Sequence, residues 1–398
     1  MMKKNWMMMY ALCVGMASCN SGKQMTGLEE ADCVAYKSDV TICEFKKLDV
    51  ENELALPLSS LAECPRIVKL DNRDEATAKG GMITVSEHYI LMGRVDDIPA
   101  KLFKKTGEFV GCVGGFGSGL GEYRFVYDQQ IDEARGRIYL FPWFGFNAVF
   151  EYDLQGKFVR NIPLAKKYPD MSFPKVKFWV EADKDRLTAF VLPFENLPVM
   201  AWTQDLDGNI IDEVPIPKQM KLKPDFSNEI IALHCTDEFS AYSFRFFNNE
   251  GDFLYHYQDG RLVPVFGVDF GDYDTPMHVL AELPRHYLGN TAKPKQLSGH
   301  LWVGDEHRDF IIDKETMKGN YFHLVNDYWG DTELPGVIGA CGRGYYQCFY
   351  APADMRALLE KALKSESLDK NVRSELQNVL DGIDDNDNGY VVYAKIKE

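Results

Sequence analysis

The chain repeats a short pattern in which an apolar or aromatic run is followed by a polar turn that ends in glycine and then by a second apolar run. Each clear copy supplies one turn glycine, and the four are Gly107, Gly156, Gly208 and Gly260. Successive turn glycines are 49, 52 and 52 residues apart. Glycine supplies the positive φ that such turns need, so each copy predicts a β-hairpin. A weaker fifth copy ends at Gly319.

Two further strand-like runs precede the hairpin in each of the first three copies. They cover residues 82–86 and 89–92, then 125–131 and 137–141, then 176–180 and 186–192. A module of about four short strands in about fifty residues is typical of a β-propeller blade. A β-sandwich also has many short strands, but it does not predict a glycine at this regular interval. The pattern therefore predicts an all-β fold, a β-propeller.

The number of blades follows from how far these modules extend. Four blades account for residues 80–267, a fifth for about 296–326, and a hairpin within 335–351 for part of a sixth. The ring must close, because an open ring leaves unpaired strand edges. Strands at 65–70 and 390–396 can complete the sixth blade from the two ends of the chain. We therefore predict a six-bladed β-propeller.

Helical patterns interrupt the strands at two places. Thr275 and Pro276 offer an N-cap and a first-turn proline to a short helix that would end near Pro284. Residues 352–383 predict a C-terminal pair of helices between the blades, at 61–351, and a ring-closing strand within 384–398. We expect this pair to brace the ring, and a partner-binding module is the alternative.

The first 18 residues have the form of a signal peptide. Lys3 and Lys4 give a positive start, and the apolar run at 6–17 is too short to cross a bilayer core of about 30 Å. Its end, Ala17-Ser18-Cys19, resembles the bacterial lipoprotein signal, so Cys19 is the predicted lipid anchor. Residues 19–60 would form a tether and N-terminal segment. The protein would then be exported and membrane-anchored, facing the periplasm or the cell surface; an ordinary signal peptide is the alternative.

A glycine-rich stretch after the first blade carries a family resemblance. Residues 114–123 are Gly-Gly-Phe-Gly-Ser-Gly-Leu-Gly-Glu-Tyr. This stretch, the strand at 64–70 and the tail at 386–397 resemble the six-bladed β-propeller lipoproteins of the Bacteroidetes, which are related to NHL-type propellers. The family loop is usually G-x-G-P-G-E-Y, and Leu120 stands where its proline is usual. The resemblance implies the fold and the lipid anchor, and it implies no established reaction.

Composition excludes two classes of protein. Hydrophobic residues at 45% and aromatic residues at 13% are too many for a disordered chain. The formal net charge is −16, and it becomes −18 without the two lysines of the signal peptide. A nucleic-acid binder normally carries a basic surface, so the charge argues against such a partner.

The motifs for phosphate, metal and disulfide chemistry are weak. The loop at 114–121 is followed by a strand, whereas a phosphate cradle needs a helix. Asp384, Asn386 and Asn388 match half of a calcium loop, but an Asx-rich turn explains them better, so we expect no cofactor beyond a weak calcium site. Without Cys13 and Cys19, an odd number of cysteines remains, and buried single thiols are favoured over disulfides. These cysteines are Cys33, Cys43, Cys64, Cys112, Cys235, Cys341 and Cys348.

Propeller geometry predicts one face where loops between second and third strands meet the loops between blades. Aromatic rings with interleaved acids and amides on such a face suit sugars or peptides. An alternative is that several of these rings pack between loops. The predicted ligand-binding residues are Arg94, Asp97, Tyr123, Arg124, Trp143, Phe146, Glu195, Asn196, His307 and Trp329, with Asp96, Phe144 and Tyr328 beside them.

These observations favour a binding or interaction module of the bacterial envelope over a catalyst. Its partner would be a glycan, a peptide or an envelope protein, and the membrane would be reached through the lipid alone. An enzyme of the lyase or hydrolase type is the alternative, with paired carboxylates from different blades in the central channel. A structural subunit of an envelope complex is a third hypothesis.

Overall fold

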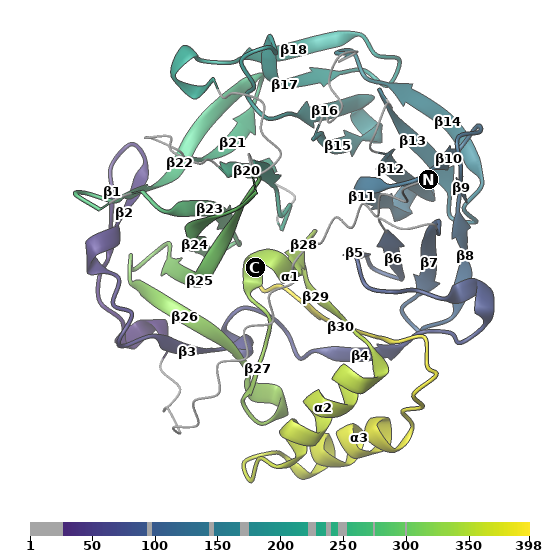
Figure 1. The fold of residues 1–398 in the computed structure, drawn as a ribbon, viewed down its shortest axis with the longest axis vertical. Coiled ribbons are helices and arrows are strands. Elements are labelled where there is room, and N and C mark those ends of the chain that lie inside the picture. The colour runs from purple at the N-terminus through teal and green to yellow at the C-terminus, as the bar shows by residue number, and fades with distance from the viewer. Residues whose placement is uncertain are drawn as a thin grey trace.

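The protein is a ring of six β-sheets arranged as blades around a central axis (Figure 1). The computed structural model describes residues 27–93, 98–142, 147–167, 175–221, 228–235, 240–245, 253–273, 275–298 and 301–398. The predicted signal peptide and Cys19 lie outside the described residues. The prediction of an all-β, six-bladed propeller with a C-terminal pair of helices is confirmed.

Blades one to three each have four antiparallel strands, with the first strand nearest the axis (Figure 1). They occupy the places that the hydrophobic pattern predicts. Blade one has β5 (Met82–Val85), β6 (Tyr89–Gly93), β7 (Ala100–Lys104) and β8 (Phe109–Val113); blade two has β11 (Val126–Asp132), β12 (Arg137–Pro142), β13 (Ala148–Asp153) and β14 (Phe158–Pro163); blade three has β15 (Lys177–Glu181), β16 (Arg186–Phe190), β17 (Val199–Gln204) and β18 (Ile210–Pro215). The glycine-rich loop, with β9 (Gly115–Phe116) and β10 (Glu122–Tyr123), connects blades one and two.

The N-terminal segment, expected to be partly a tether, adds strands to two blades. Blade four has β19 (Glu229–Ile231), β20 (Ser240–Arg245), β21 (Phe253–Gln258) and β22 (Arg261–Asp269), and it is extended by β2 (Thr41–Glu44) and β1 (Ala35–Lys37). Strand β2 runs parallel to β22, and β3 (Leu54–Pro57) runs parallel to β26 in blade five. Val34 and Cys43 are fully buried, so this part of the segment belongs to the ring.

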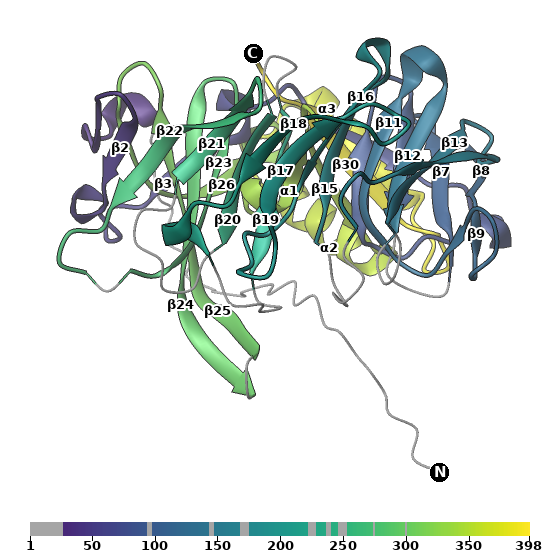
Figure 2. The ribbon, with the colours of Figure 1, turned by 90° about the horizontal axis from the view of Figure 1, so that it is seen from above.

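Blade five contains a hairpin with much longer strands than the other blades. It has β23 (Met277–Glu282), β24 (His286–Ser298), β25 (Leu301–Asp313), β26 (Gly319–Asn326) and β27 (Thr332–Glu333). The predicted helix after Pro276 is wrong: all six residues of β23, His278 and Glu282 included, are buried and paired with β24, so strand pairing and burial outweigh the helix-capping pattern. The blade therefore begins earlier than predicted. The β24–β25 hairpin projects beyond the ring (Figure 2).

Blade six closes the ring with strands from both ends of the chain, as predicted. Its order is β28 (Cys341–Gly342), β29 (Tyr345–Tyr350), β30 (Tyr390–Lys395) and β4 (Arg66–Lys69). The buried Val391 of β30 pairs with Phe349 on one side and Val68 on the other. Closure in this way leaves β30 with neighbours on both edges.

The four turn glycines all contact the outer strand of the preceding blade. Their φ angles are 90°, 77°, 96° and 71° in chain order, which confirms the predicted turn geometry. A Cβ added to each glycine would come close to that outer strand. On Gly107 it would lie 2.0 Å from the nearest atom of Lys69, and on Gly156 it would lie 1.9 Å from Cys112. On Gly208 it would lie 3.2 Å from Pro163, and on Gly260 it would lie 2.9 Å from Asp212. The fifth copy differs, because Met317 carries the positive φ of 57° and Gly319 begins β26. Glycine therefore recurs about every fifty residues for two reasons: the turn needs a positive φ, and the neighbouring blade leaves no room for a side chain.

The two longer helices pack against the outer side of blade six (Figure 1). Helices α2 (Pro352–Leu363) and α3 (Lys370–Asp381) share a buried cluster with Tyr390 and Val392 of β30, which agrees with the expected brace. A third helix, α1 (Val337–Ala340), lies near the axis (Figure 1). Among the helices of the described residues, none has the length and apolar character needed to cross a lipid bilayer.

Asp387 links the two strands that close the ring, β4 and β30. Its carboxylate accepts hydrogen bonds from Asn72 (2.7 Å) and the Tyr390 hydroxyl (2.5 Å), and it forms an ion pair with Lys69 at 2.8 Å. Burial alone would raise the pKa of Asp387, but these hydrogen bonds outweigh it and lower the pKa to about 2. The ionised carboxylate therefore stabilises the folded ring.

We expect the stabilising effect of Asp387 to depend on pH. In the unfolded chain an aspartate has a pKa of about 3.9, so the stabilisation is present above about pH 4 and is lost as the pH falls toward 2. Urea unfolding of the wild type and Asp387→Asn from pH 7 to pH 2 should show a difference that shrinks across this window. Asp385→Asn is the control, because the Asp385 side chain is 87% exposed. A difference that stays constant down to pH 2 would contradict this account.

Candidate functional site

Part of the predicted ligand face lies outside the described residues. These positions are Arg94, Asp96, Asp97, Trp143, Phe144 and Phe146. Of the rest, Arg124 is exposed just before β11, and Glu195 and Asn196 are exposed between β16 and β17. These three side chains therefore lie at the surface, on two separate loops.

Two predicted rings are buried inside the protein. Tyr123 is 2% exposed, and its hydroxyl donates a hydrogen bond to the Val113 carbonyl and accepts one from the Ala100 N–H at 2.9 Å. Trp329 is 4% exposed and packs in the cluster formed with α2 and α3. Both rings therefore stabilise packing between elements, which was the alternative expectation, and neither is proposed as a ligand contact.

His307 lies on the long hairpin, exposed on β25. Its Nδ1 is 2.9 Å from Asn290 Oδ1, and the Asn290 amide donates to Asp309 at 2.7 Å. Burial raises the pKa of Asp309 to about 6, although the hydrogen bond from Asn290 lowers it. His307 is thus part of a polar network within blade five. The other predicted ligand-binding residues belong to other parts of the chain.

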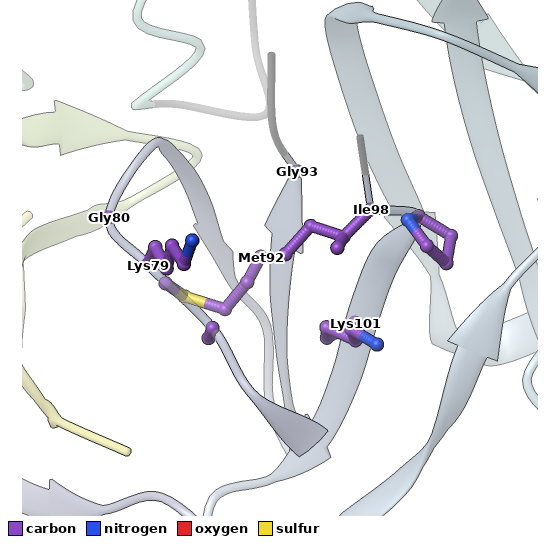
Figure 3. Close-up of a pocket in the computed structure, with 8 residues that line it drawn as sticks. Lys79, Gly80, Met92, Gly93, Ile98 and Lys101 are labelled. Carbon is purple, nitrogen blue, oxygen red and sulfur yellow. The ribbon is translucent and has the colours of Figure 1, made fainter. Parts of the chain in front are cut away.

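A small cavity lies where blade one meets the segment that leads into it. Figure 3 shows Met92, Ile98 and Lys101 around it, with Lys79 and Gly80 opposite. Its volume is about 10 Å³, which is the space of about one water molecule. The Lys101 ammonium donates to the Glu75 carbonyl at 2.6 Å. The cavity is therefore too small for an organic ligand.

A larger surface groove lies at the rim of blade four. We call it the rim groove; its volume is about 330 Å³, within the range of about 300–1,000 Å³ that is usual for ligand sites. It is formed where β2 and β22 end side by side, because these strands run parallel and their C-terminal ends coincide. Its lining residues are Glu44, Lys46, Asp269, Phe270, Gly271, Asp272 and Tyr273.

Aromatic rings form one wall of the rim groove. The rings of Phe45 and Phe270 are 4.9 Å apart, and those of Phe45 and Tyr273 are 5.8 Å apart. Tyr273 is 60% exposed. The three carboxylates of the lining outnumber Lys46, the single cation among these residues. Sequence reasoning missed this site because two of its seven lining residues, Glu44 and Lys46, come from the N-terminal segment, which showed no strand pattern.

A second group of polar side chains lies around the propeller axis. We call it the axial cluster, and it comes from blades two, three, four and six. Lys175 forms an ion pair with Glu229 at 3.4 Å, and Glu229 accepts a hydrogen bond from the Tyr127 hydroxyl. Lys177 lies 4.3 Å from the centroid of the Tyr127 ring. The members are Tyr127, Asp128, Lys175, Lys177, Trp179, Glu229, His234 and Arg343.

Arg343 contacts three other blades from the β28–β29 turn. Its Nε donates to the Gln129 carbonyl at 3.1 Å, its backbone N–H donates to the Leu233 carbonyl at 2.7 Å, and its guanidinium carbon is 4.9 Å from the Trp179 ring centroid. The His234 ring stacks on Trp179 at 4.8 Å. Both Arg343 and His234 have positive φ, of 50° and 49°, a conformation that costs about 1–3 kcal/mol without glycine and often marks a functional position.

The segment that resembles a calcium loop forms an Asx-rich turn. The Asp384 carboxylate accepts from the backbone and side-chain N–H groups of Asn386, at 2.8 and 2.9 Å. The Asn388 side chain accepts from Ala78 N–H and donates to two backbone carbonyls. Among the described residues no group of His, Cys, Asp and Glu is arranged to hold a metal ion. All seven described cysteines are free thiols.

Comparison with known proteins supports the fold. A protein of Bacteroides fragilis described as exported (BF0058) superposes with a TM-score of 0.58 at 14% identity, covering 87% of this chain and 98% of that one. The extracellular domain of a hybrid two-component system protein from B. thetaiotaomicron (BT4673) gives a TM-score of 0.36 at 12% identity, over 64% of this chain and 29% of that one. No curated protein sequence matches.

The family comparison covers most of the chain. A profile described as "Domain of unknown function (DUF4934)" matches residues 42–395, from β2 to the end of β30. The match therefore includes all six blades, most of β2, strand β3 and the helical pair, and β1 lies before it. On this basis the chain belongs to the DUF4934 family.

Proposed function

We propose that the protein is an exported, lipid-anchored binding module that holds a basic peptide segment of a partner in the rim groove. The observation that carries this proposal is the groove itself, an open space lined by three carboxylates and two aromatic side chains. The signal-like N-terminus ending at Cys19 supports export and anchoring. The similar fold of an exported B. fragilis protein agrees with this location.

The charge of the groove favours a basic peptide over a neutral sugar. Glu44 is already ion-paired with Lys47 at 2.5 Å, so Asp269 and Asp272 are the carboxylates that would attract a lysine or arginine side chain. The exposed Tyr273 ring can lie against such a cation, an interaction of about 0.5–2 kcal/mol. A net charge of −16 for the whole chain would also draw a basic partner toward it.

Binding of short blocked peptides tests this proposal. A pentapeptide with a central lysine should bind more tightly than its glutamine counterpart, and the difference should fall with rising salt. Asp272→Asn or Tyr273→Ala should weaken lysine-peptide binding about tenfold by calorimetry, equivalent to about 1.4 kcal/mol. Phe116→Ala is the matched control, because Phe116 is an exposed ring outside the groove.

Two results would contradict the proposal. One is equal binding of the lysine and glutamine peptides. The other is binding of a neutral oligosaccharide at the groove, lost in Tyr273→Ala, together with no binding of the lysine peptide. The second result would identify the glycan alternative.

A further inference from the structure

Arg343 is a half-buried residue whose guanidinium has one buried hydrogen-bonding position that no described residue fills. Its Nε has a partner, but its Nη1 is buried and has none among the described residues. Arginine keeps its proton in proteins, so the charge cannot be removed by titration. A buried cation without a compensating anion costs several kcal/mol. The structure around Arg343 should therefore contain, or admit, a negative group.

The nearby acids do not fill this position. Asp128 is the nearest carboxylate that acts on Arg343, and its oxygens accept from the backbone N–H groups of Gln129 and Phe178, at 3.0 and 2.9 Å. Glu229 is held by Tyr127 and Lys175. The axial cluster thus contains three cations, Lys175, Lys177 and Arg343, and two anions. Neither Lys177 nor Arg343 forms an ion pair with another residue that the structure describes.

His234 adds a second unfilled position beside the same tryptophan. It is 8% exposed, and its Nε2 has no partner among the described residues. Burial, helped by the charges of Arg343 and Lys177, lowers the pKa of His234 well below its usual range. The ring is therefore neutral, and it can present an Nε2–H donor. Arg343 and His234 both lie against the Trp179 indole, at 4.9 and 4.8 Å.

We propose that Arg343 and His234 bind a carboxylate on the propeller axis, with Trp179 as the apolar wall of the site. A carboxylate brings one negative charge to the Arg343 guanidinium, and its two oxygens can accept from Arg343 Nη1 and His234 Nε2. A metal cation would be repelled by the excess positive charge. A water molecule would fill the hydrogen bonds but leave the charge uncompensated. This site is distinct from the rim groove and does not depend on the function proposed there.

Thermal unfolding of the purified protein at constant ionic strength tests this site. Replacing chloride with acetate should raise the unfolding temperature in a saturable manner, because a ligand that binds only the folded state stabilises it. Arg343→Gln should weaken the apparent affinity about tenfold or more, and His234→Gln should weaken it less. Arg261→Gln is the control, since Arg261 is an exposed arginine on β22. Phosphate, run in parallel, should be the weaker ligand because it carries more charge than the site lacks.

A second measurement keeps the test decisive if Arg343→Gln does not fold. Arg343→Lys keeps the charge but loses the forked donor geometry, and it should also bind acetate more weakly. Intrinsic fluorescence should change on acetate addition in the wild type and not in Trp179→Phe. The proposal would be overturned by an acetate response that equals the chloride response, or by one that persists unchanged in both Arg343 variants. Stronger stabilisation by phosphate than by acetate would also overturn the choice of a carboxylate.

Discussion

Gly156→Ala is expected to destabilise the protein by about 3 kcal/mol or more. The new Cβ would lie 1.9 Å from the Cys112 carbonyl oxygen and 3.0 Å from Val113 Cα, so blades one and two would have to separate. The Gly156 carbonyl also accepts a hydrogen bond from Gly114 N–H at 2.9 Å, which such a separation would break. Urea unfolding followed by far-UV circular dichroism would measure the change.

Gly136→Ala is the matched control for this prediction. Gly136 also has a positive φ, of 63°, but its Cβ would meet nothing nearer than 3.7 Å. Its replacement should cost only the backbone term of about 1–2 kcal/mol. Equal losses in the two variants would show that turn conformation alone, and not contact between blades, explains the repeated glycine.

Val391→Asp is expected to prevent ring closure. Val391 is fully buried in the middle of β30, between Phe349 and Val68, so an aspartate there would be a buried charge with strands on both sides. The cost should exceed about 4 kcal/mol, enough to unfold a protein of ordinary stability. Limited proteolysis and the unfolding temperature would both report the loss.

Lys395→Asp is the control for the closing strand. Lys395 lies on the same strand but is exposed, so its replacement should change the stability by no more than about 0.5 kcal/mol. A stable, protease-resistant Val391→Asp variant would show that the ring does not need β30. A Lys395→Asp variant as unstable as Val391→Asp would show that added negative charge, rather than burial, is the cause.

The blades could be predicted from the sequence because their signals are local. A turn glycine and the strands beside it lie within a few residues of each other, and closure by 390–396 follows from the need to pair edges. Blade five was harder, because the cap-like Thr275-Pro276 suggests a helix, while β23 is decided by pairing with β24. Local propensity is overridden where an element is buried on both faces.

The candidate sites could not be predicted in the same way. The rim groove depends on β2 pairing in parallel with β22, and no sequence pattern in either segment indicates that the two strands pair. Arg343 lies in the β28–β29 turn and His234 in the segment after β19, and only the ring geometry brings them to the same indole. The predicted face relied on aromatic residues near loops, but burial of Tyr123 and Trp329 shows that an aromatic residue between strands is as often part of the packing.

The contact between Gly107 and Lys69 has a consequence for the order in which the chain folds. Lys69 belongs to β4, which precedes blade one in the chain, so blade one can pack on this strand of blade six before β28, β29 and β30 have been made. Blades two to four can then assemble in sequence, each on the outer strand of the one before. Strand β4 has no strand partner in its own blade until β30, which comes far later in the sequence, has been made. A chain truncated before β30 would therefore carry a row of blades with one unpaired strand at its start, and the pairing of β30 with β4 would complete the ring.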